Sequence, residues 1–301
     1  MTRAFIFPGQ GSQAVGMGKA LAEAFPQARA VFDEVDAALS QKLSTVMWEG
    51  PAEDLTLTSN AQPALMAVSM AVMRVLEAEA GLELRRDAAF VAGHSLGEYS
   101  ALAAAGSLKL DDTARLLRIR GDAMQNATPV GVGAMAALLG LEGEVCDVAN
   151  DNGSGQVVVS GNKSAVERAI ALAQSRGAKR AILLPVSAPF HCALLEPAAE
   201  AMRAALGTVG IAAPIVPVVA NVEAAPVTTP EAIRDSLVRQ VTGTVRWRES
   251  VAFMAGEGVD AFYEVGAGKV LTGLVKRIAA GAGATAIGTP EDVATFKGAT
   301  G

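Results

Sequence analysis

The stretch "AAFVAGHSLGEYSALAAAG", residues 88–106, constrains the fold more than any other part of the chain. Its first third is a short apolar run typical of a buried strand, and its second half is rich in alanine and other helix formers. A strand therefore has to turn directly into a helix through the segment Gly93-His94-Ser95-Leu96-Gly97. This order predicts an α/β fold in which Ser95 lies on a tight turn with its hydroxyl exposed.

The rest of the chain repeats this alternation of short apolar runs and helical stretches, which predicts an α/β fold with a mainly parallel sheet. The C-terminal residues 294–301 are expected to form a frayed tail. The other elements expected are strands at 4–7, 88–93, 215–221 and 261–266 and helices at 17–39, 60–81, 94–106, 111–125, 196–207 and 269–280.

After Thr128 the pattern changes to shorter units, which predicts a small α+β insertion. The insertion is expected at residues 128–190, inside a large core made of residues 1–127 and 191–301. Its elements in order are a strand at 133–141, a helix at 142–150, a strand at 155–161, a helix at 162–177 and a strand at 178–187.

Composition excludes several classes of protein. The longest apolar run, residues 130–141, is shorter than the ~18 residues that a membrane span needs, and no secretory signal is recognisable, so we expect a soluble, cytoplasmic protein. Cys146 and Cys192 are too few for a disulfide framework or a cysteine-rich zinc site, and no metal is expected. A net charge of -6 with 4% aromatic residues argues against nucleic-acid binding.

A serine on such a turn needs a base before it becomes a nucleophile, and the base is usually a histidine. The chain has two histidines. His94 directly precedes Ser95, so its side chain leaves the turn in another direction. His191, in "VSAPFHCALLEP", is therefore the candidate base, although a histidine near an apolar segment is often purely structural. The neighbouring Cys192 is interpreted as a buried structural residue.

Arg120 lies on the apolar face of its own predicted helix. A step of 100° per residue places it with Leu116 and Met124, whereas Arg115 and Arg118 fall on the opposite face. A guanidinium among apolar side chains is costly unless an anion pairs with it. Two interpretations remain open here: an internal salt bridge, or a substrate carboxylate held by two parallel hydrogen bonds.

The N-terminal segment "FIFPGQGSQAVGMG" fits the glycine pattern of a dinucleotide-binding loop at Gly9, Gly11 and Ala14. Such a loop is followed by one helix, a second strand and an acidic residue that holds a ribose. Here the acidic residues at 33, 34 and 36 fall within a helical stretch, and another helix follows. A dinucleotide-binding oxidoreductase is therefore a weak alternative.

Several motifs together resemble the malonyl-CoA:acyl carrier protein transacylase family, from about Phe5 to Ile278: "FPGQGSQ", "GHSLGEYSAL", "GAMAA", "PFHCAL" and "GKVLTGL". The resemblance implies an α/β-hydrolase-like core with a mainly parallel sheet and an inserted ferredoxin-like subdomain. It also implies malonyl transfer from malonyl-CoA to acyl carrier protein in fatty acid biosynthesis, through a malonyl-serine ester and without a metal or other cofactor. We expect a monomer.

The resemblance also assigns residues to roles. Ser95 corresponds to the nucleophile and His191 to the base, which the main-chain carbonyl of Gln240 orients in place of an aspartate. Arg120 corresponds to the partner of the malonyl carboxylate. The other implied site residues are Gln10 and Leu96, whose backbone N–H groups form the oxyanion hole, and Gln62 and Phe190 in the substrate cleft; His94 is expected to line the same site.

Three alternatives stay open at this point. A malonyltransferase of a polyketide pathway would use the same chemistry. A serine carboxylesterase of the α/β-hydrolase class shares the Ser95 turn, but its histidine lies late in the chain, whereas a long segment follows His191, and no "HGGG" segment is present. A non-catalytic module that docks a carrier protein would not become acylated on Ser95.

Overall fold

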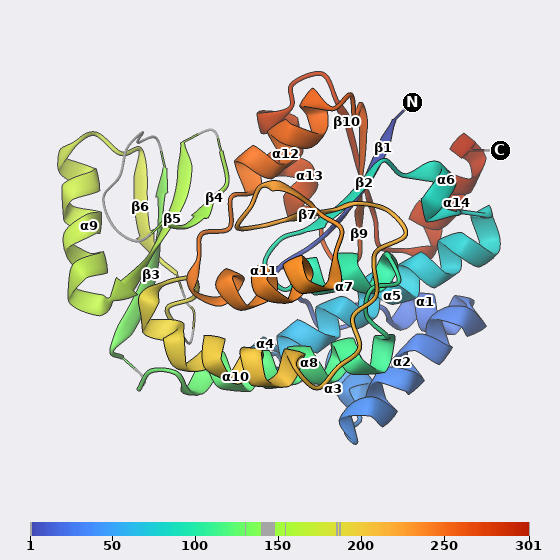
Figure 1. The fold of residues 1–301 in the computed structure, drawn as a ribbon, viewed down its shortest axis with the longest axis horizontal. Coiled ribbons are helices and arrows are strands. Elements are labelled where there is room, and N and C mark those ends of the chain that lie inside the picture. Colours follow the sequence, from blue (N-terminus) through green and yellow to red (C-terminus); the bar gives the residue numbers. More distant parts are fainter. Residues whose placement is uncertain are drawn as a thin grey trace.

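The computed structural model describes residues 2–129, 131–139, 148–153, 155–184, 186 and 188–300. Two sheets organise these residues: a six-stranded sheet in the order β10-β9-β1-β2-β7-β8 and a four-stranded sheet in the order β4-β5-β3-β6. Figure 1 shows the smaller sheet and α9 as a lobe beside a larger body that contains both chain ends. The mixed α/β fold class with a mainly parallel sheet is confirmed.

The large sheet brings the ends of β1 and β2 side by side. β1 pairs in parallel with both β9 and β2, and only the edge pair β7–β8 is antiparallel. Phe7 is in register with Gly93, so the loop after β1 meets the turn after β2. The strands are β1 (Arg3–Phe7), β2 (Phe90–Gly93), β7 (Val218–Ala220), β8 (Ala225–Val227), β9 (Ala261–Val265) and β10 (Gly283–Ile287).

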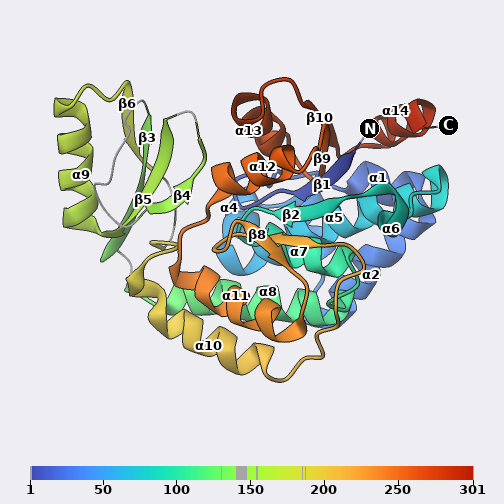
Figure 2. The same cartoon turned by 45° about the horizontal axis from the view of Figure 1, so that its top comes forward.

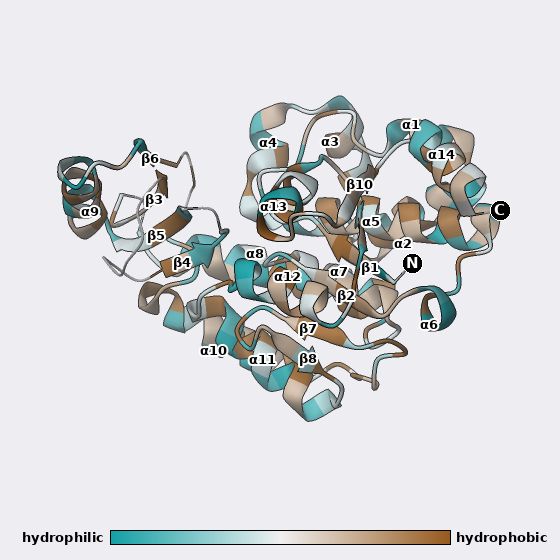
Figure 3. Ribbon diagram, turned by 90° about the horizontal axis from the view of Figure 1, so that it is seen from above, coloured by the Kyte–Doolittle hydropathy of each residue, from teal (hydrophilic) through white to brown (hydrophobic). Residues whose placement is uncertain are grey.

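Helices cover both faces of this sheet, as Figure 2 shows. Alternate side chains of β1 enter different cores: Phe5 and Phe7 pack on the side of α5 and α7, whereas Ala4 and Ile6 pack on the side of α12 and α13. Figure 3 shows hydrophobic colouring on strands of both sheets and a mixture of hydrophobic and hydrophilic residues on the helices. The helices of the large body are α1 (Lys19–Ala24), α2 (Pro26–Leu39), α3 (Leu43–Glu49), α4 (Ala52–Thr56), α5 (Thr58–Ala80), α6 (Leu84–Asp87), α7 (Gly97–Ala104), α8 (Leu110–Asn126), α10 (Glu196–Leu206), α11 (Pro230–Thr242), α12 (Trp247–Gly256), α13 (Val270–Ile278) and α14 (Pro290–Thr300), with a 3₁₀ turn at Ala193–Leu195.

The small lobe is an antiparallel sheet with one helix against it. Val166, Ala169 and Ala173 of α9 pack on Ala136 and Val159 of the sheet. The domain boundaries expected at 127/128 and 190/191 stay a prediction. The elements of the lobe are β3 (Gly133–Leu139), β4 (Val148–Asp151), β5 (Gln156–Asn162), α9 (Lys163–Ser175) and β6 (Arg180–Leu183).

The structure corrects the sequence prediction in three places. The helix expected at 17–39 is divided at Phe25, because Pro26 forces the preceding residue into an extended conformation and begins a new helix. Residues 148–150, expected to be helical, belong to β4, while 141–147 lie outside the described residues. The tail expected to fray from residue 294 lies in α14, whose Phe296 is buried against Phe5 and Tyr263.

No helix in the described part of the chain combines the length and the apolar character needed to cross a membrane.

Two helical glycines provide a test of how closely α5 and α8 pack. A Cβ at Gly121 in α8 would lie 2.6 Å from Ser59 Cα, whereas a Cβ at Gly273 in α13 would meet no heavy atom within 4 Å. Gly121→Ala should lower the free energy of unfolding by about 1–3 kcal/mol through overpacking. Gly273→Ala should raise it by about 0.5–1 kcal/mol, because alanine is the better helix former. Urea unfolding followed by circular dichroism measures both, and a similar change for both variants would contradict the close packing.

Candidate active site

Ser95 lies on a strained turn between β2 and α7. Its φ is 53°, in the left-handed region that residues other than glycine seldom adopt. The flanking glycines make the turn sterically possible. A Cβ at Gly93 would lie 1.9 Å from the carbonyl carbon of Gly97, and one at Gly97 would lie 2.3 Å from Phe7 O. The G-x-S-x-G spacing is therefore a packing requirement of this turn.

Asn221, which directly follows β7, holds the turn from the neighbouring strand. Its Oδ1 accepts the Ser95 N–H at 2.8 Å, and its Nδ2 donates to Gly93 O at 2.7 Å. The side chain is fully buried, so both bonds are shielded from water. The sequence analysis did not identify Asn221. The signal that could have found it is a polar side chain placed immediately after a buried strand.

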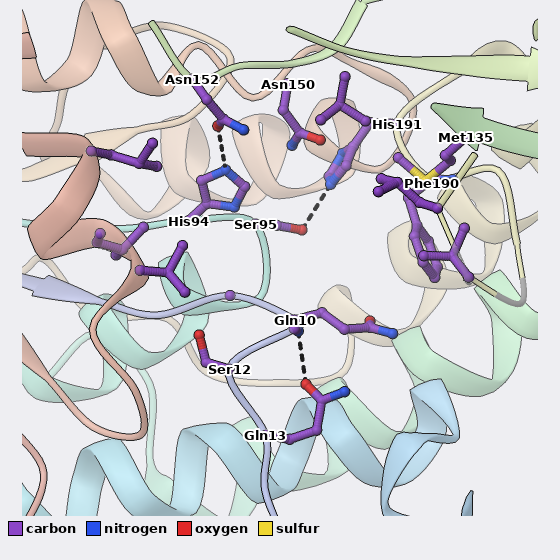
Figure 4. Close-up of a pocket in the computed structure, with 18 of the residues that line it drawn as sticks. Gln10, Ser12, Gln13, His94, Ser95, Met135, Asn150, Asn152, Phe190 and His191 are labelled. Carbon is purple, nitrogen blue, oxygen red and sulfur yellow. Dashed lines mark hydrogen bonds between the residues drawn. The ribbon is translucent and has the colours of Figure 1, made fainter. Parts of the chain in front are cut away.

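The Ser95 hydroxyl contacts the imidazole of His191. Ser95 Oγ lies 2.8 Å from His191 Nε2, and His191 Nδ1 lies 2.8 Å from the main-chain oxygen of Gln240. A carbonyl oxygen only accepts, so Nδ1 carries the proton and Nε2 is left with a lone pair toward Ser95. Figure 4 shows this contact. The arrangement can remove a proton from the serine.

The pKa of His191 is lowered from 6.5 to about 3, first by burial and then by the positive charge of Arg120. Both effects disfavour the imidazolium form. His191 is therefore neutral at pH 7, which is the form that accepts a proton.

Arg120 enters the same site from α8 and is only 1% exposed. Its Nη1 donates to Gln62 Oε1 at 2.8 Å, and its Nη2 donates to Gln240 Oε1 at 2.9 Å and to Ser95 Oγ at 3.1 Å. The guanidinium also lies over the Tyr99 ring, 5.6 Å from its centroid. Within the described residues no carboxylate lies within salt-bridge distance of Arg120. Neutral amide oxygens thus hold a cation whose charge remains available to an anion.

A cleft of about 680 Å³ opens between the two lobes at this point. Ser95, His191 and Arg120 lie in its wall, and Met135 and Val158 line it from the small lobe. Figure 4 shows Met135 and Phe190 beside the Ser95–His191 contact. Small-molecule sites are commonly clefts of roughly 300–1,000 Å³, so this one is large enough for an extended ligand.

The loop after β1 presses against the Ser95 turn. A Cβ at Gly9 would lie 2.8 Å from His94 O, so the two backbones are in close contact there. The Gly11 N–H is held by Gln13 Oε1 at 2.7 Å. The backbone N–H groups of Gln10 and Leu96 have no hydrogen-bond acceptor among the described residues. This loop therefore lies against the serine turn, and its contacts do not support the dinucleotide interpretation.

The remaining predicted site residues also lie at the cleft. Gln62 is buried, and its Nε2 lies 3.7 Å from Met124 Sδ while its Oε1 faces Arg120. Phe190 lies beside Met135, whose sulfur accepts the Phe190 N–H at 3.3 Å.

His94 points away from Ser95. Its Nε2 lies 3.1 Å from Asn152 Oδ1 of the small lobe, and its ring lies 5.6 Å from that of Trp247. Burial lowers the pKa of His94 to about 4, so it is neutral at pH 7. Asn152, which the sequence analysis missed, connects the small lobe to the Ser95 turn through this contact.

Glu98 is a further buried polar residue that the sequence analysis did not single out. Its Oε2 accepts the Asn221 N–H and one Gln240 Nε2–H, each at 2.9 Å. Burial raises the pKa of Glu98 to about 7. Its signal in the sequence was a single carboxylate at the start of an alanine-rich helix that has no other charged residue. Among the residues that the structure describes, no group of three His, Cys, Asp or Glu side chains could hold a metal ion.

The family model described as "Acyl transferase domain" matches residues 4–291. The chain is 47% identical over 304 residues to the malonyl CoA-acyl carrier protein transacylase of Escherichia coli K12, with 97% of each chain covered. It is 46% identical to the protein of that name from Bacillus subtilis strain 168, covering 96% of this chain and 94% of the relative.

Solved structures show the same similarity. The acyl-carrier-protein-S-malonyltransferase of Bartonella henselae matches with a TM-score of 0.97 and 57% identity, covering 100% of this chain and 99% of that one. A malonyl-transacylase solved in complex with its type II PKS acyl-carrier protein matches with a TM-score of 0.95 and 41% identity, covering 99% and 100%.

The protonation of His191 can be followed by NMR of its imidazole nitrogens. We expect the neutral form, with the proton on Nδ1, to persist from about pH 8 to about pH 5, where an exposed histidine would already be protonated. Arg120→Met removes a nearby positive charge and should raise the pKa of His191, while burial keeps it below 6.5. A wild-type His191 that titrates near pH 6.5 would contradict the assignment.

Proposed function

The chain belongs to the acyl transferase domain family and, within it, to the malonyl CoA-acyl carrier protein transacylases, and from this we propose that it transfers malonyl groups by a ping-pong route through an ester on Ser95. The donor is malonyl-CoA and the acceptor is the phosphopantetheine thiol of acyl carrier protein. The proposal rests on one observation: Ser95 Oγ lies within hydrogen-bond distance of both the neutral His191 imidazole and the buried Arg120 guanidinium.

In the first half-reaction, Ser95 Oγ forms a bond to the thioester carbonyl carbon while its proton passes to His191 Nε2. The carbonyl oxygen becomes an oxyanion, for which the N–H groups of Gln10 and Leu96 are the donors. Removing one such donor typically costs ~10²–10³ in rate. When the carbon–sulfur bond breaks, the proton on His191 passes to the sulfur of CoA, which leaves as a thiol.

The second half-reaction reverses these roles. The carrier thiol gives its proton to His191 Nε2 and its sulfur attacks the ester carbonyl carbon. The bond to Ser95 Oγ breaks, and that oxygen takes the proton back from the imidazole. Both pantetheine arms must therefore reach the same hydroxyl, which is consistent with one open cleft between the lobes.

No carboxylate is required behind the histidine in this scheme. The Gln240 carbonyl keeps the proton on His191 Nδ1 and the lone pair on Nε2 toward Ser95. Arg120 opposes protonation of the imidazole, which favours passing the proton on to the leaving group. A thioester is a reactive acyl donor, so a weakly basic histidine is sufficient.

Arg120 supplies the preference for malonyl groups in this proposal. A malonyl carboxylate can replace the Ser95 hydroxyl as an acceptor and form charge-assisted hydrogen bonds with the guanidinium. An acetyl group would leave the buried cation without an anionic partner. The buried Arg120 cation beside Ser95 also argues against a carboxylesterase, because a simple ester has no negatively charged group to pair with it.

We place the reaction in fatty acid biosynthesis, in the cytoplasm, while a polyketide system would use the same chemistry. We also propose that the protein acts as a monomer, because the groups that this scheme uses, Ser95, His191 and Arg120, all come from one chain and contact one another within it. Light scattering that returned twice the mass of one chain would contradict this last point.

The covalent step is tested by intact-protein mass spectrometry after mixing with malonyl-CoA. The wild type should gain the mass of one malonyl group on Ser95, and Ser95→Ala should gain none, because no other described side chain in the cleft wall has a hydroxyl or thiol in contact with a histidine. Cys192→Ala, which removes the thiol next to His191, is the matched control and should still be labelled. Labelling that persists in Ser95→Ala would refute the nucleophile.

The selectivity of Arg120 is tested by comparing malonyl and acetyl loading. Arg120→Ala should lower kcat/KM for malonyl loading by about 10²-fold, because losing one partner of a buried charge pair costs about 2–5 kcal/mol, while acetyl loading is spared or improved. Arg115→Ala is the control: this arginine lies on the exposed face of the same helix, paired with Asp111 and Asp112. Equal losses for both substrates in Arg120→Ala would contradict the selectivity role.

A further inference from the structure

We propose that Glu98 is a positioning residue that orients the side-chain amide of Gln240 and through it aims the Arg120 guanidinium at the substrate carboxylate. The inference rests on the proposed function of Arg120. Glu98 lies on α7, three residues after Ser95, and is 1% exposed. Its side chain is not among the described residues that line the cleft, so it acts only through its neighbours.

One oxygen of Glu98 receives two donors. Oε2 accepts the main-chain N–H of Asn221 and one Nε2–H of Gln240, both at 2.9 Å. The Asn221 N–H is part of the backbone just after β7, so this carboxylate is held in place by the sheet. Glu98 therefore presents a fixed acceptor to the Gln240 amide.

The amide of Gln240 has a donor end and an acceptor end, and its surroundings permit one orientation. Nε2 lies within hydrogen-bond distance of Glu98 Oε2, of Ser95 O at 3.0 Å and of Asn221 Oδ1 at 3.3 Å, so the donor end faces three acceptors. Oε1 then points toward Arg120, whose Nη2 lies 2.9 Å away. A flipped amide would place oxygen against three oxygens and an NH₂ group against the guanidinium, which is unfavourable at both ends.

The orientation of Gln240 is transmitted to the plane of the guanidinium. Gln240 Oε1 holds Nη2 and Gln62 Oε1 holds Nη1, which fixes the group at two nitrogens while Nη2 also reaches Ser95 Oγ in the cleft wall. Paired hydrogen bonds to a carboxylate depend on this plane. If Gln240 lost its orientation, Arg120 would lose one of its two side-chain amide acceptors.

The acceptor role of Glu98 does not depend on its charge. Burial raises the pKa of Glu98 to about 7, so the side chain is partly protonated near neutral pH. Because both donors use Oε2, the proton of the neutral form resides on Oε1 and the two bonds persist. An uncharged side chain with an oxygen at the same position should therefore replace Glu98.

The test compares Glu98→Met, which removes the acceptor, with Glu98→Gln, which keeps an amide oxygen. The readout is the ratio of kcat/KM for malonyl over acetyl loading of Ser95. We expect Glu98→Met to lower this ratio about tenfold through misplacement of Arg120, and Glu98→Gln to restore most of it. Asp36→Asn is the matched control, because Asp36 is also a buried carboxylate but it caps α3 through Ser44, away from the cleft. It should lower stability and leave the ratio unchanged.

A double-mutant cycle tests whether Glu98 acts on Arg120 through the side-chain amide of Gln240. Gln240→Met keeps the main-chain carbonyl that contacts His191 and removes the amide, so it should lower the ratio by itself. Glu98→Met added to it should lower the ratio no further. If Glu98→Met does not fold, the other two variants still test the inference. Gln240→Met must lower the malonyl-to-acetyl ratio of kcat/KM, and Glu98→Gln must leave most of that ratio intact.

The inference is overturned by an unchanged ratio in Glu98→Met or Gln240→Met, by equal losses in Glu98→Met and Glu98→Gln, or by additive losses in the double variant. These outcomes differ from failure of the proposed function. In that case the wild-type protein would take no malonyl group on Ser95, whatever residue stands at position 98.

Discussion

The left-handed turn at Ser95 is the constraint on which the site depends. Holding a non-glycine residue in this conformation costs of order 1–3 kcal/mol, and the surrounding contacts must supply it. Asn221 bonds the Ser95 N–H and the Gly93 carbonyl, and the backbone contacts at Gly93 and Gly97 leave no space for a side chain at either glycine. The result is a hydroxyl whose position is set by the packing of β1, β2 and β7.

A buried cation without a carboxylate partner is the second organising feature. Arg120 is held by the amide oxygens of Gln62 and Gln240, which accept hydrogen bonds from Nη1 and Nη2 without neutralising the guanidinium. Burial lowers the pKa of His191, and the charge of Arg120 lowers it further, so the imidazole beside the serine is neutral at pH 7. The same low-dielectric surroundings strengthen the attraction of Arg120 for an anion in the cleft. In the proposed function, this one residue both binds the substrate carboxylate and lowers the pKa of the base.

Local sequence patterns were sufficient to predict the elements that carry the chemistry. Ser95 was marked by a strand running into a helix, and Arg120 by its place on an apolar helix face; the structure buries Arg120 as expected. The sequence patterns gave the wrong secondary structure where contacts with distant parts of the chain determine it. Residues 148–150 join β5 as a strand, and the C-terminal segment is held in a helix by aromatic contacts of Phe296. Pro26 was a local signal for a helix break that the sequence prediction did not use.

The spacing of residues along the chain was enough to predict the α/β alternation, the turn at Ser95 and the buried face of α8. Each of these features depends on residues that are close together in the sequence, within one or two helical turns or at the end of one strand. Hydrogen-bond partners depend on the order of strands in the sheet. Asn221 and Gln240 bond to Ser95 across 126 and 145 residues of sequence, and the atom that meets His191 Nδ1 is a main-chain oxygen, which no side-chain pattern can indicate. The geometry around Ser95, including the place of Glu98 behind it, arises only when β1, β2 and β7 lie side by side, because that brings distant polar atoms within hydrogen-bonding distance.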